Sequence, residues 1–143
     1  PVEAHRAWLD GELAKANGKW TFVVFHFPPY APDDENPEIM EKWIPVLEEH
    51  RVDFVLSGHV HNYLRTKPIR AGKVVESGEH GIVYLITVAV KGRDAGIPKP
   101  EYAEAWDASG ENFFTHFRVE EDRVVIATEN AEGKCYDKAE YKR

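Results

Sequence analysis

The first half of the chain alternates between helix-like and strand-like hydrophobic patterns. Residues 3–16 carry apolar side chains at helical spacing, which predicts an amphipathic helix that ends near Gly18. The run Trp-Thr-Phe-Val-Val-Phe at residues 20–25 is short and continuously apolar, which predicts a strand buried on both faces. Apolar residues recur at helical spacing from 39 to 47, and Pro45 within them predicts a kink or a new helix start near Trp43.

The second half reads mainly as strands. Residues 52–57 predict a second buried strand, and the apolar run at 82–90 predicts a third. Residues 91–112 read as an irregular insertion, whereas 113–119 and 123–129 alternate and predict an antiparallel hairpin. Helices and strands followed by strands alone predict an α/β (α+β) fold whose first part leads into an antiparallel sheet. The 143 residues fit a single domain that spans residues 1–143.

Composition narrows the possible partners. Hydrophobic residues make up 43% and charged residues 30% of the chain, as in ordinary folded domains. No apolar run approaches the roughly 20 residues of a membrane-spanning helix, so we expect no membrane span. A formal charge of −7 argues against nucleic-acid binding, which needs a basic face. An acidic chain that handles phosphate must obtain positive charge elsewhere, and metal ions are one source. Cys135 is the single cysteine, which excludes an internal disulfide and a cysteine-rich zinc site.

Three histidines occupy equivalent positions after two predicted strands. His26 follows the first strand, whereas His59 and His61 follow the second. Ligands of open α/β sheets collect outside the carboxyl ends of the strands, so we expect the three imidazoles to gather at one edge of the sheet. Gly58 lacks a Cβ, so we expect the backbone to turn sharply there. Any one such histidine is more often hydrogen-bonded or solvated than a ligand, and it is the combination that indicates a metal site. We assign no role to the other histidines: His5, His50, His80 and His116.

These segments resemble the calcineurin-like metallophosphoesterases, and within them the purple-acid-phosphatase-like branch. The resemblance is carried by Gly-His-Val-His-Asn-Tyr at 58–63 together with His-Phe-Pro-Pro-Tyr at 26–30. It extends over residues 4–90 in register, with a looser match for the final hairpin. It implies the C-terminal half of a metallophosphoesterase-type β-sandwich that is flanked by helices and ends in antiparallel strands.

The resemblance also implies a chemistry. Such enzymes bind two divalent or trivalent metal ions, with iron, manganese and zinc as the possibilities, and a metal-activated hydroxide attacks a phosphate mono- or diester. His26 and His59 match the positions that ligate the second metal, and His61 matches a ligand of the first. Phe27 stands where many relatives carry another histidine, so a substrate contact is lost there.

The sequence also departs from the family. The segments Asp-x-His, Gly-Asp-x-x-Asp and Gly-Asn-His occur nowhere in the chain. We therefore expect the N-terminal half of the domain to be absent, and this chain to be inactive alone. Three neutral imidazoles can hold one zinc ion with water as the fourth ligand.

Two other interpretations stay open. One is a non-catalytic metal-binding or interaction domain derived from this fold, and the other is a structural fragment whose histidines bind nothing. Apolar strands without their other half would expose a hydrophobic face and unpaired edges. We therefore expect the chain to pair with the missing half or to self-associate through the exposed sheet.

Overall fold

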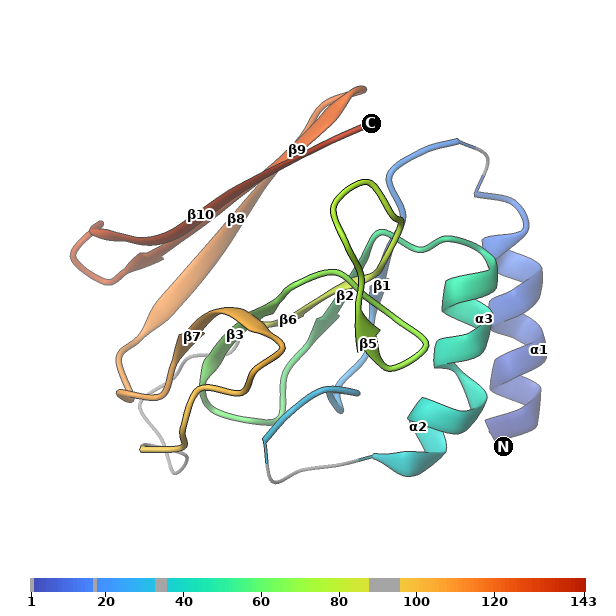
Figure 1. The fold of residues 1–143 in the computed structure, drawn as a ribbon, viewed down its shortest axis with the longest axis horizontal. Helices are drawn as coiled ribbons and strands as arrows, with labels where there is room; N and C mark the ends of the chain where they lie inside the picture. Colours follow the sequence, from blue (N-terminus) through green and yellow to red (C-terminus); the bar gives the residue numbers. More distant parts are fainter. Residues whose placement is uncertain (1, 17, 33–35, 88–95) are drawn as a thin grey trace.

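A computed structural model describes residues 2–16, 18–32, 36–87 and 96–143. Three helices and ten strands follow one another in these segments (Figure 1). In chain order they are α1 (Val2–Leu13), β1 (Phe22–Val24), α2 (Pro37–Lys42), α3 (Ile44–Glu49), β2 (Phe54–Ser57), β3 (Tyr63–Thr66), β4 (Ile69–Arg70), β5 (Lys73–Val74), β6 (Val83–Ile86), β7 (Ala103–Asp107), β8 (Phe113–Val119), β9 (Arg123–Asn130) and β10 (Cys135–Lys142).

The strands form a mixed sheet and a separate antiparallel sheet. The mixed sheet has the order β1-β2-β6-β3-β7, in which β1, β2 and β6 run parallel and β3 runs antiparallel to both of its neighbours. Strands β8, β9 and β10 form the antiparallel sheet, and β4 pairs with β5 in a small ribbon. The three helices lie on one side of the mixed sheet and the antiparallel sheet lies on the other (Figure 1). This confirms the expected α/β fold that ends in antiparallel strands.

Strands β2 and β6 are apolar at every position except Ser57 because their side chains contribute to two hydrophobic cores. Val55 of β2 and Tyr84 of β6 pack in a core with Leu13, Ile44 and Leu47 of the helical layer. Their sequence neighbours point the other way, and Phe54, Val83 and Leu85 pack against Val124 and Ile126 of β9. Successive side chains of a strand alternate between faces, so a strand covered on both sides needs no polar positions.

The second helical segment is broken at Trp43, as its sequence predicts. Pro45 lies in the first turn of α3, where its missing amide hydrogen removes no helical hydrogen bond. Helix α3 ends in a Schellman motif, in which the Arg51 amide donates to the Glu48 carbonyl (3.1 Å) and the Val52 amide donates to the Leu47 carbonyl (2.9 Å). Arg51 has a φ of 52°, in the left-handed region that usually holds glycine at this position.

The structure corrects several details of the sequence interpretation. Strand β1 lies at one end of the strand order rather than inside the sheet, and Val24 is 72% exposed. The presumed insertion at 91–112 contains strand β7, which pairs with β3. Strand β10 was not predicted, because its polar residues hide the alternation. The parts of the expected elements at 88–90 and 91–95 lie outside the described residues.

A buried ion pair fastens the antiparallel sheet to the mixed sheet. Arg65 of β3 donates to both carboxylate oxygens of Asp137 on β10, at 2.7 and 2.9 Å. The Tyr63 hydroxyl donates to the same carboxylate at 2.7 Å, and Arg65 donates to the Tyr141 hydroxyl at 3.1 Å. The side chains of Arg65 and Asp137 are 9% and 10% exposed. Each charge is therefore compensated almost entirely by its partners rather than by water.

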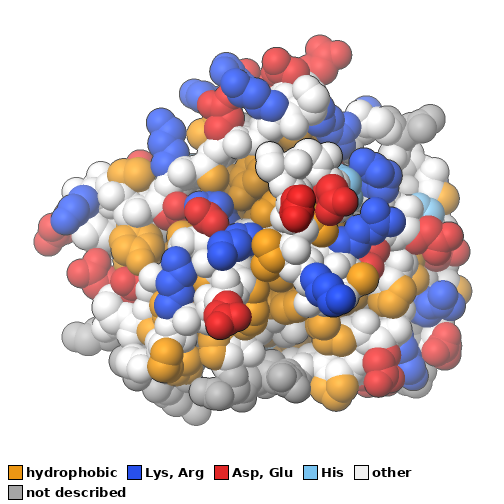
Figure 2. Space-filling model, in the orientation of Figure 1, with side chains coloured by type: hydrophobic (Ala, Val, Ile, Leu, Met, Phe, Trp, Pro, Cys, Tyr) orange, Lys and Arg blue, Asp and Glu red, His pale blue; other side chains and the backbone are white. Residues whose placement is uncertain are grey.

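The surface carries mixed charge. On the face drawn in Figure 2, acidic and basic side chains are interspersed around a central area of hydrophobic side chains. None of the helices in the described residues is long and apolar enough to cross a membrane.

Replacing Asp137 by alanine should strongly destabilise the chain, because the Arg65 guanidinium would stay buried without its counter-charge. We expect the free energy of unfolding to fall by about 3–5 kcal/mol. Urea unfolding followed by circular dichroism measures the change. Glu140→Ala on the same strand is the matched control, since its exposed ion pair with Lys142 contributes at most about 1 kcal/mol. Equal losses in the two variants would contradict the role given to the buried pair.

The effect of Asp137 should also depend on pH. Burial raises the pKa of this carboxyl, but hydrogen bonds from Arg65 and Tyr63 outweigh burial and hold the pKa below its ordinary value of 3.8. A carboxyl with a lowered folded pKa stabilises the fold above its ordinary value, and this contribution is lost as pH falls through the lowered value. The unaltered chain should therefore exceed Asp137→Ala in free energy of unfolding by the largest amount near neutral pH. This difference should shrink below about pH 4.

Candidate functional site

The parallel pairing of β1 with β2 brings two distant histidines to one edge of the sheet. Phe22 pairs with Phe54 and Val24 pairs with Leu56, so the two strands end at the same level. Backbone hydrogen bonding continues past the strands, where the Gly58 amide donates to the His26 carbonyl at 3.0 Å. His26 and His59 therefore leave neighbouring carboxyl ends, 33 positions apart in the sequence.

The imidazoles of His26 and His59 meet directly. His59 Nδ1 lies 3.2 Å from His26 Nε2, and the ring centroids are 5.1 Å apart at a steep interplanar angle of 74°. Both residues are exposed. A single proton between the two nitrogens makes a hydrogen bond, and without it both lone pairs can face one cation. This pair is the part of the expected site that the structure brings together.

The turn that carries His59 is strained. The Val60 amide donates to the Gly58 carbonyl at 2.8 Å, which closes a three-residue turn with His59 at its centre. We had expected a sharp turn at Gly58. The left-handed residue of this loop is instead His59, with a φ of 65°. A left-handed conformation costs a residue with a side chain about 1–2 kcal/mol. Strain of this kind is often retained where it aims a functional side chain.

Phe27 forms a wall beside both imidazoles. Its ring centroid lies 4.6 Å from that of His59 and 5.0 Å from that of His26. The side chain is nevertheless 45% exposed, so it covers only one side of the pair. The sequence suggested only a lost substrate contact at this position, and the orienting contact with the two rings was missed.

Two buried polar side chains flank the histidine loop without partners. Asn62 is 1% exposed, and neither its amide nitrogen nor its oxygen has a hydrogen-bond partner among the described residues. The Ser57 hydroxyl is likewise buried and unpaired within that part of the chain. Leaving such a group unsatisfied costs about 1–3 kcal/mol, so each one calls for an explanation at a functional site. Sequence reasoning missed both residues, although they border the Gly-His-Val-His segment directly.

The His26–His59 pair has the spacing of two ligands of one metal ion. Two nitrogens bound at ~2.0–2.1 Å with a tetrahedral angle lie about 3.3 Å apart, close to the separation in the structure. Neutral imidazole also suits zinc, iron and manganese. The donor set therefore fits part of a metal site.

His61 does not complete a three-ligand group. It follows His59 by two residues and is half-buried. Within the described ranges, no three His, Cys, Asp or Glu side chains come close enough together to hold a metal ion.

The remaining histidines lie elsewhere. His5 packs against Trp43, His50 contacts Asp10 at 2.6 Å, His80 lies 4.0 Å from Asp53, and His116 lies 3.9 Å from Glu129. None of these contacts involves the His26–His59 pair.

Comparisons with known proteins show the family of the chain. The family model described as "Calcineurin-like phosphoesterase" matches residues 1–63, which include both strands and all three expected ligands. The chain belongs to the calcineurin-like phosphoesterase family. Purple acid phosphatase 18 of Arabidopsis thaliana is 35% identical over 116 residues, which cover 72% of this chain and 26% of that protein. Purple acid phosphatase 1 of Ipomoea batatas is 30% identical over 71% of this chain and 26% of its own length.

Two solved structures show the same architecture. The purple acid phosphatase PPD1 from yellow lupin seeds superposes with a TM-score of 0.80 over 96% of this chain, at 19% identity. GAP50, the anchor in the inner membrane complex of Plasmodium, superposes with a TM-score of 0.76 over 98% of this chain, at 15% identity. At these identities the likeness concerns the fold. The chain spans 28% and 42% of those two chains and about a quarter of the two plant phosphatases above.

The strain at His59 can be measured by comparing glycine with alanine. Both His59→Gly and His59→Ala remove the imidazole, but glycine alone adopts a left-handed conformation without a penalty. We expect the glycine variant to be more stable by about 1 kcal/mol in urea unfolding. The same two substitutions at His61, whose φ is not positive, should give the opposite order. Greater stability of the alanine variant at position 59 would show that the turn is different in solution.

Proposed function

We propose that this chain supplies histidine ligands to a dinuclear metal centre that hydrolyses phosphate mono- or diesters, and that it is inactive alone. The proposal is carried by the contact between His26 and His59, whose ring nitrogens lie 3.2 Å apart at the carboxyl edge of parallel strands. The family uses dinuclear metal sites, and its described activity is that of phosphoesterases. The chemistry of this particular chain follows from its own residues.

Each residue of the edge has a distinct task in the proposal. His26 and His59 would hold one ion together through their ring nitrogens, and His61 would be a ligand of the other ion. Phe27 limits rotation of both imidazoles by packing against them. The strained turn at His59 carries a ring that lies against that of His26. A fixed ring orientation reduces the entropy lost when a metal binds.

When bound, a dinuclear centre of iron, manganese or zinc supplies a water of lowered pKa as nucleophile and positive charge for the phosphoryl oxygens. That charge matters in a chain whose own net charge is −7, because a phosphate ester would otherwise be repelled. The three histidines contribute no negative charge. A carboxylate would be needed to separate two cations, and no group of three potential ligands in the described residues supplies one beside the histidines. In this proposal the carboxylate comes from another segment of the domain.

The free edge of strand β1 is a place where a partner that completes the site could pair. Strand β1 pairs with β2 on one side, and Val24 is exposed on the strand that precedes His26. Exposed strand edges pair readily with further strands. We propose that the N-terminal half of the same domain adds to this edge and brings the remaining ligands. Self-association through the exposed sheet is the alternative arrangement.

A second function belongs to a different class. The fold is shared with a Plasmodium protein described as an anchor, which favours a non-catalytic metal-binding or interaction domain as the alternative. In that case the histidine pair would hold a structural ion or none.

The metal proposal is tested by titrating zinc into the purified chain in a calorimeter. We expect His26→Ala and His59→Ala to weaken zinc binding by at least about tenfold each, since each removes a direct ligand. His116→Ala is the control, because His116 is an exposed histidine on β8 and that strand belongs to the other sheet. If neither substitution changed zinc binding, His26 and His59 would not be the metal ligands.

The hydrolytic part is tested in a polypeptide that joins this chain to the aspartate- and asparagine-bearing segments of the family. We expect hydrolysis of an aryl phosphate that His59→Ala abolishes and His116→Ala preserves. Zinc binding without hydrolysis in that polypeptide would favour the non-catalytic alternative.

A further inference from the structure

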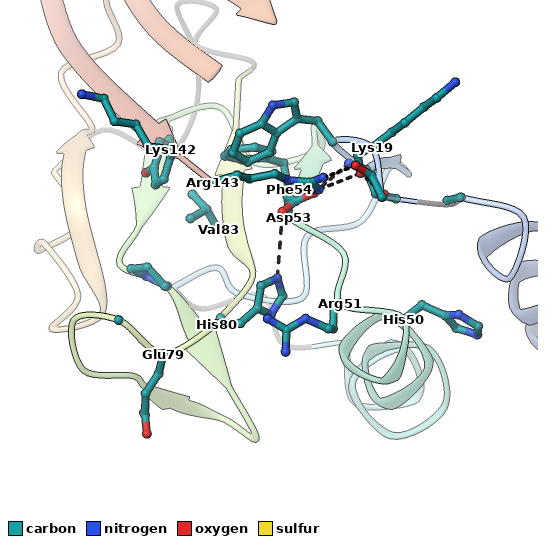
Figure 3. A pocket seen from close by; sticks show the side chains of 18 residues that line it. Lys19, His50, Arg51, Asp53, Phe54, Glu79, His80, Val83, Lys142 and Arg143 are labelled. Atoms are coloured by element: carbon teal, nitrogen blue, oxygen red, sulfur yellow. Dashed lines mark hydrogen bonds and ion pairs between the residues drawn. The ribbon is translucent and has the colours of Figure 1, made fainter. Parts of the chain in front are cut away.

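A pocket of about 630 Å³ opens at the opposite ends of β1 and β2 from the histidine pair (Figure 3). It lies between the start of β2, the loop before β6 and the end of β10, and its lining includes Trp20, Arg51, Asp53, His80 and Arg143. Nothing in the proposed phosphoesterase chemistry uses these residues.

The lining is basic although the chain is acidic. Four cationic side chains and two carboxylates contribute to it. The cations are Lys19, Arg51, Lys142 and Arg143, and the carboxylates are Asp53 and Glu79. Glu79, Lys19 and Lys142 point away from the pocket centre in Figure 3. The charged groups that remain at the pocket are Arg51, Arg143 and Asp53, which leave an excess of one positive charge. A concave site with excess positive charge attracts small anions.

Arg51 is held in the pocket by a strained backbone. It occupies the left-handed position of the Schellman motif after α3, where glycine would be free of strain. No carboxylate among the described residues forms an ion pair with its guanidinium. The side chain extends toward His80 in Figure 3. A planar guanidinium offers paired donors that match the oxygens of phosphate or carboxylate.

His80 presents a second polar group to the same space. Its Nε2 atom is buried and has no hydrogen-bond partner within the described part of the chain. The nearest carboxylate oxygen, Asp53 Oδ1, is 4.0 Å away. Burial lowers the pKa of this imidazole, and the charge of Arg51 lowers it further, whereas Asp53 acts in the opposite direction. The Asp53 carboxylate is thus near the ring but too far away to accept a hydrogen bond from it.

The opposite wall is already neutralised. Asp53 Oδ2 accepts hydrogen bonds from the Thr21 amide at 2.8 Å and from Arg143 at 2.9 Å. Arg143 also donates to the Lys19 carbonyl at 2.7 Å, and its guanidinium stacks 4.5 Å from the Trp20 ring centroid. Asp53 and Arg143 therefore balance each other and shape the wall, while Arg51 and His80 are left to receive a ligand.

We propose that this pocket binds a phosphate dianion, free or as the phosphate group of a small metabolite, between the Arg51 guanidinium and His80. The tetrahedral oxygens of a phosphate can face the guanidinium and the imidazole together, whereas a carboxylate offers only two oxygens. The site is one of binding alone and involves no covalent step.

The test is calorimetric titration of the complete chain with inorganic phosphate at low ionic strength, after treatment with a chelator. We expect saturable one-to-one binding that Arg51→Gly weakens at least tenfold. Glycine suits the left-handed backbone, so this variant should have an equal or higher Tm, and loss of binding cannot be ascribed to unfolding. His80→Gln should also weaken binding. Arg118→Gln, an exposed arginine on β8, is the control and should bind normally.

Three results would overturn the proposal. The first is that the unaltered chain does not bind phosphate, and the second is that Arg51→Gly binds it as tightly as the unaltered chain. The third is that the His26→Ala, His59→Ala double variant loses binding, which would place the phosphate at the histidine pair. Acetate that binds as tightly as phosphate would contradict the preference for a dianion. Tighter binding of a phosphorylated metabolite such as glycerol 3-phosphate than of inorganic phosphate would support the ester form, and the reverse order would support free phosphate.

Discussion

The parallel pairing of β1 with β2 is the constraint on which the rest of the molecule depends. Because the register sets Val24 against Leu56, both strands end together, and their following histidines meet at one edge. The same register sets Phe22 against Phe54 at the other end, where Thr21 and Asp53 are joined by a hydrogen bond. A shift of one residue would turn every side chain to the other face and separate both pairs. The histidine pair and the basic pocket are thus two consequences of one alignment.

The second requirement is that both faces of these short strands be covered. Helices α1 and α3 cover one face, and the antiparallel sheet covers the other. The second contact is secured by the Arg65–Asp137 pair, which is buried and oriented by Tyr63. Arg143 provides a further tie between the end of β10 and the start of β2. The antiparallel sheet therefore helps to hold β2 in place, although it contributes no residue to the histidine edge.

The sequence predicts those elements that depend on a few neighbouring residues. The buried run at 52–57 and the helix break near Trp43 follow from a few neighbouring residues, and both are confirmed. Strands β7 and β10 were not predicted because they contain many polar residues. Their strand conformation depends on pairing with other strands, β3 and β9. The Arg65–Asp137 pair joins residues 72 positions apart. At the site, strand ends predict the meeting of His26 and His59, but the left-handed turn depends on loop geometry that no residue pattern specifies.

Strain is concentrated at the two ends of β2. Three residues other than glycine have positive φ in the described ranges: Arg51, His59 and Ala71. Two of them stand three residues before and two residues after β2, and each carries the side chain on which a proposed site depends. Glycine would relieve about 1–2 kcal/mol at either position but would remove the guanidinium or the imidazole. If neither side chain had a function, a single substitution by glycine would remove the strain at no other cost. The strained residues at both ends of β2 therefore favour a role for each side chain. Ala71 has no such side chain, and its turn between β4 and β5 lies at neither site.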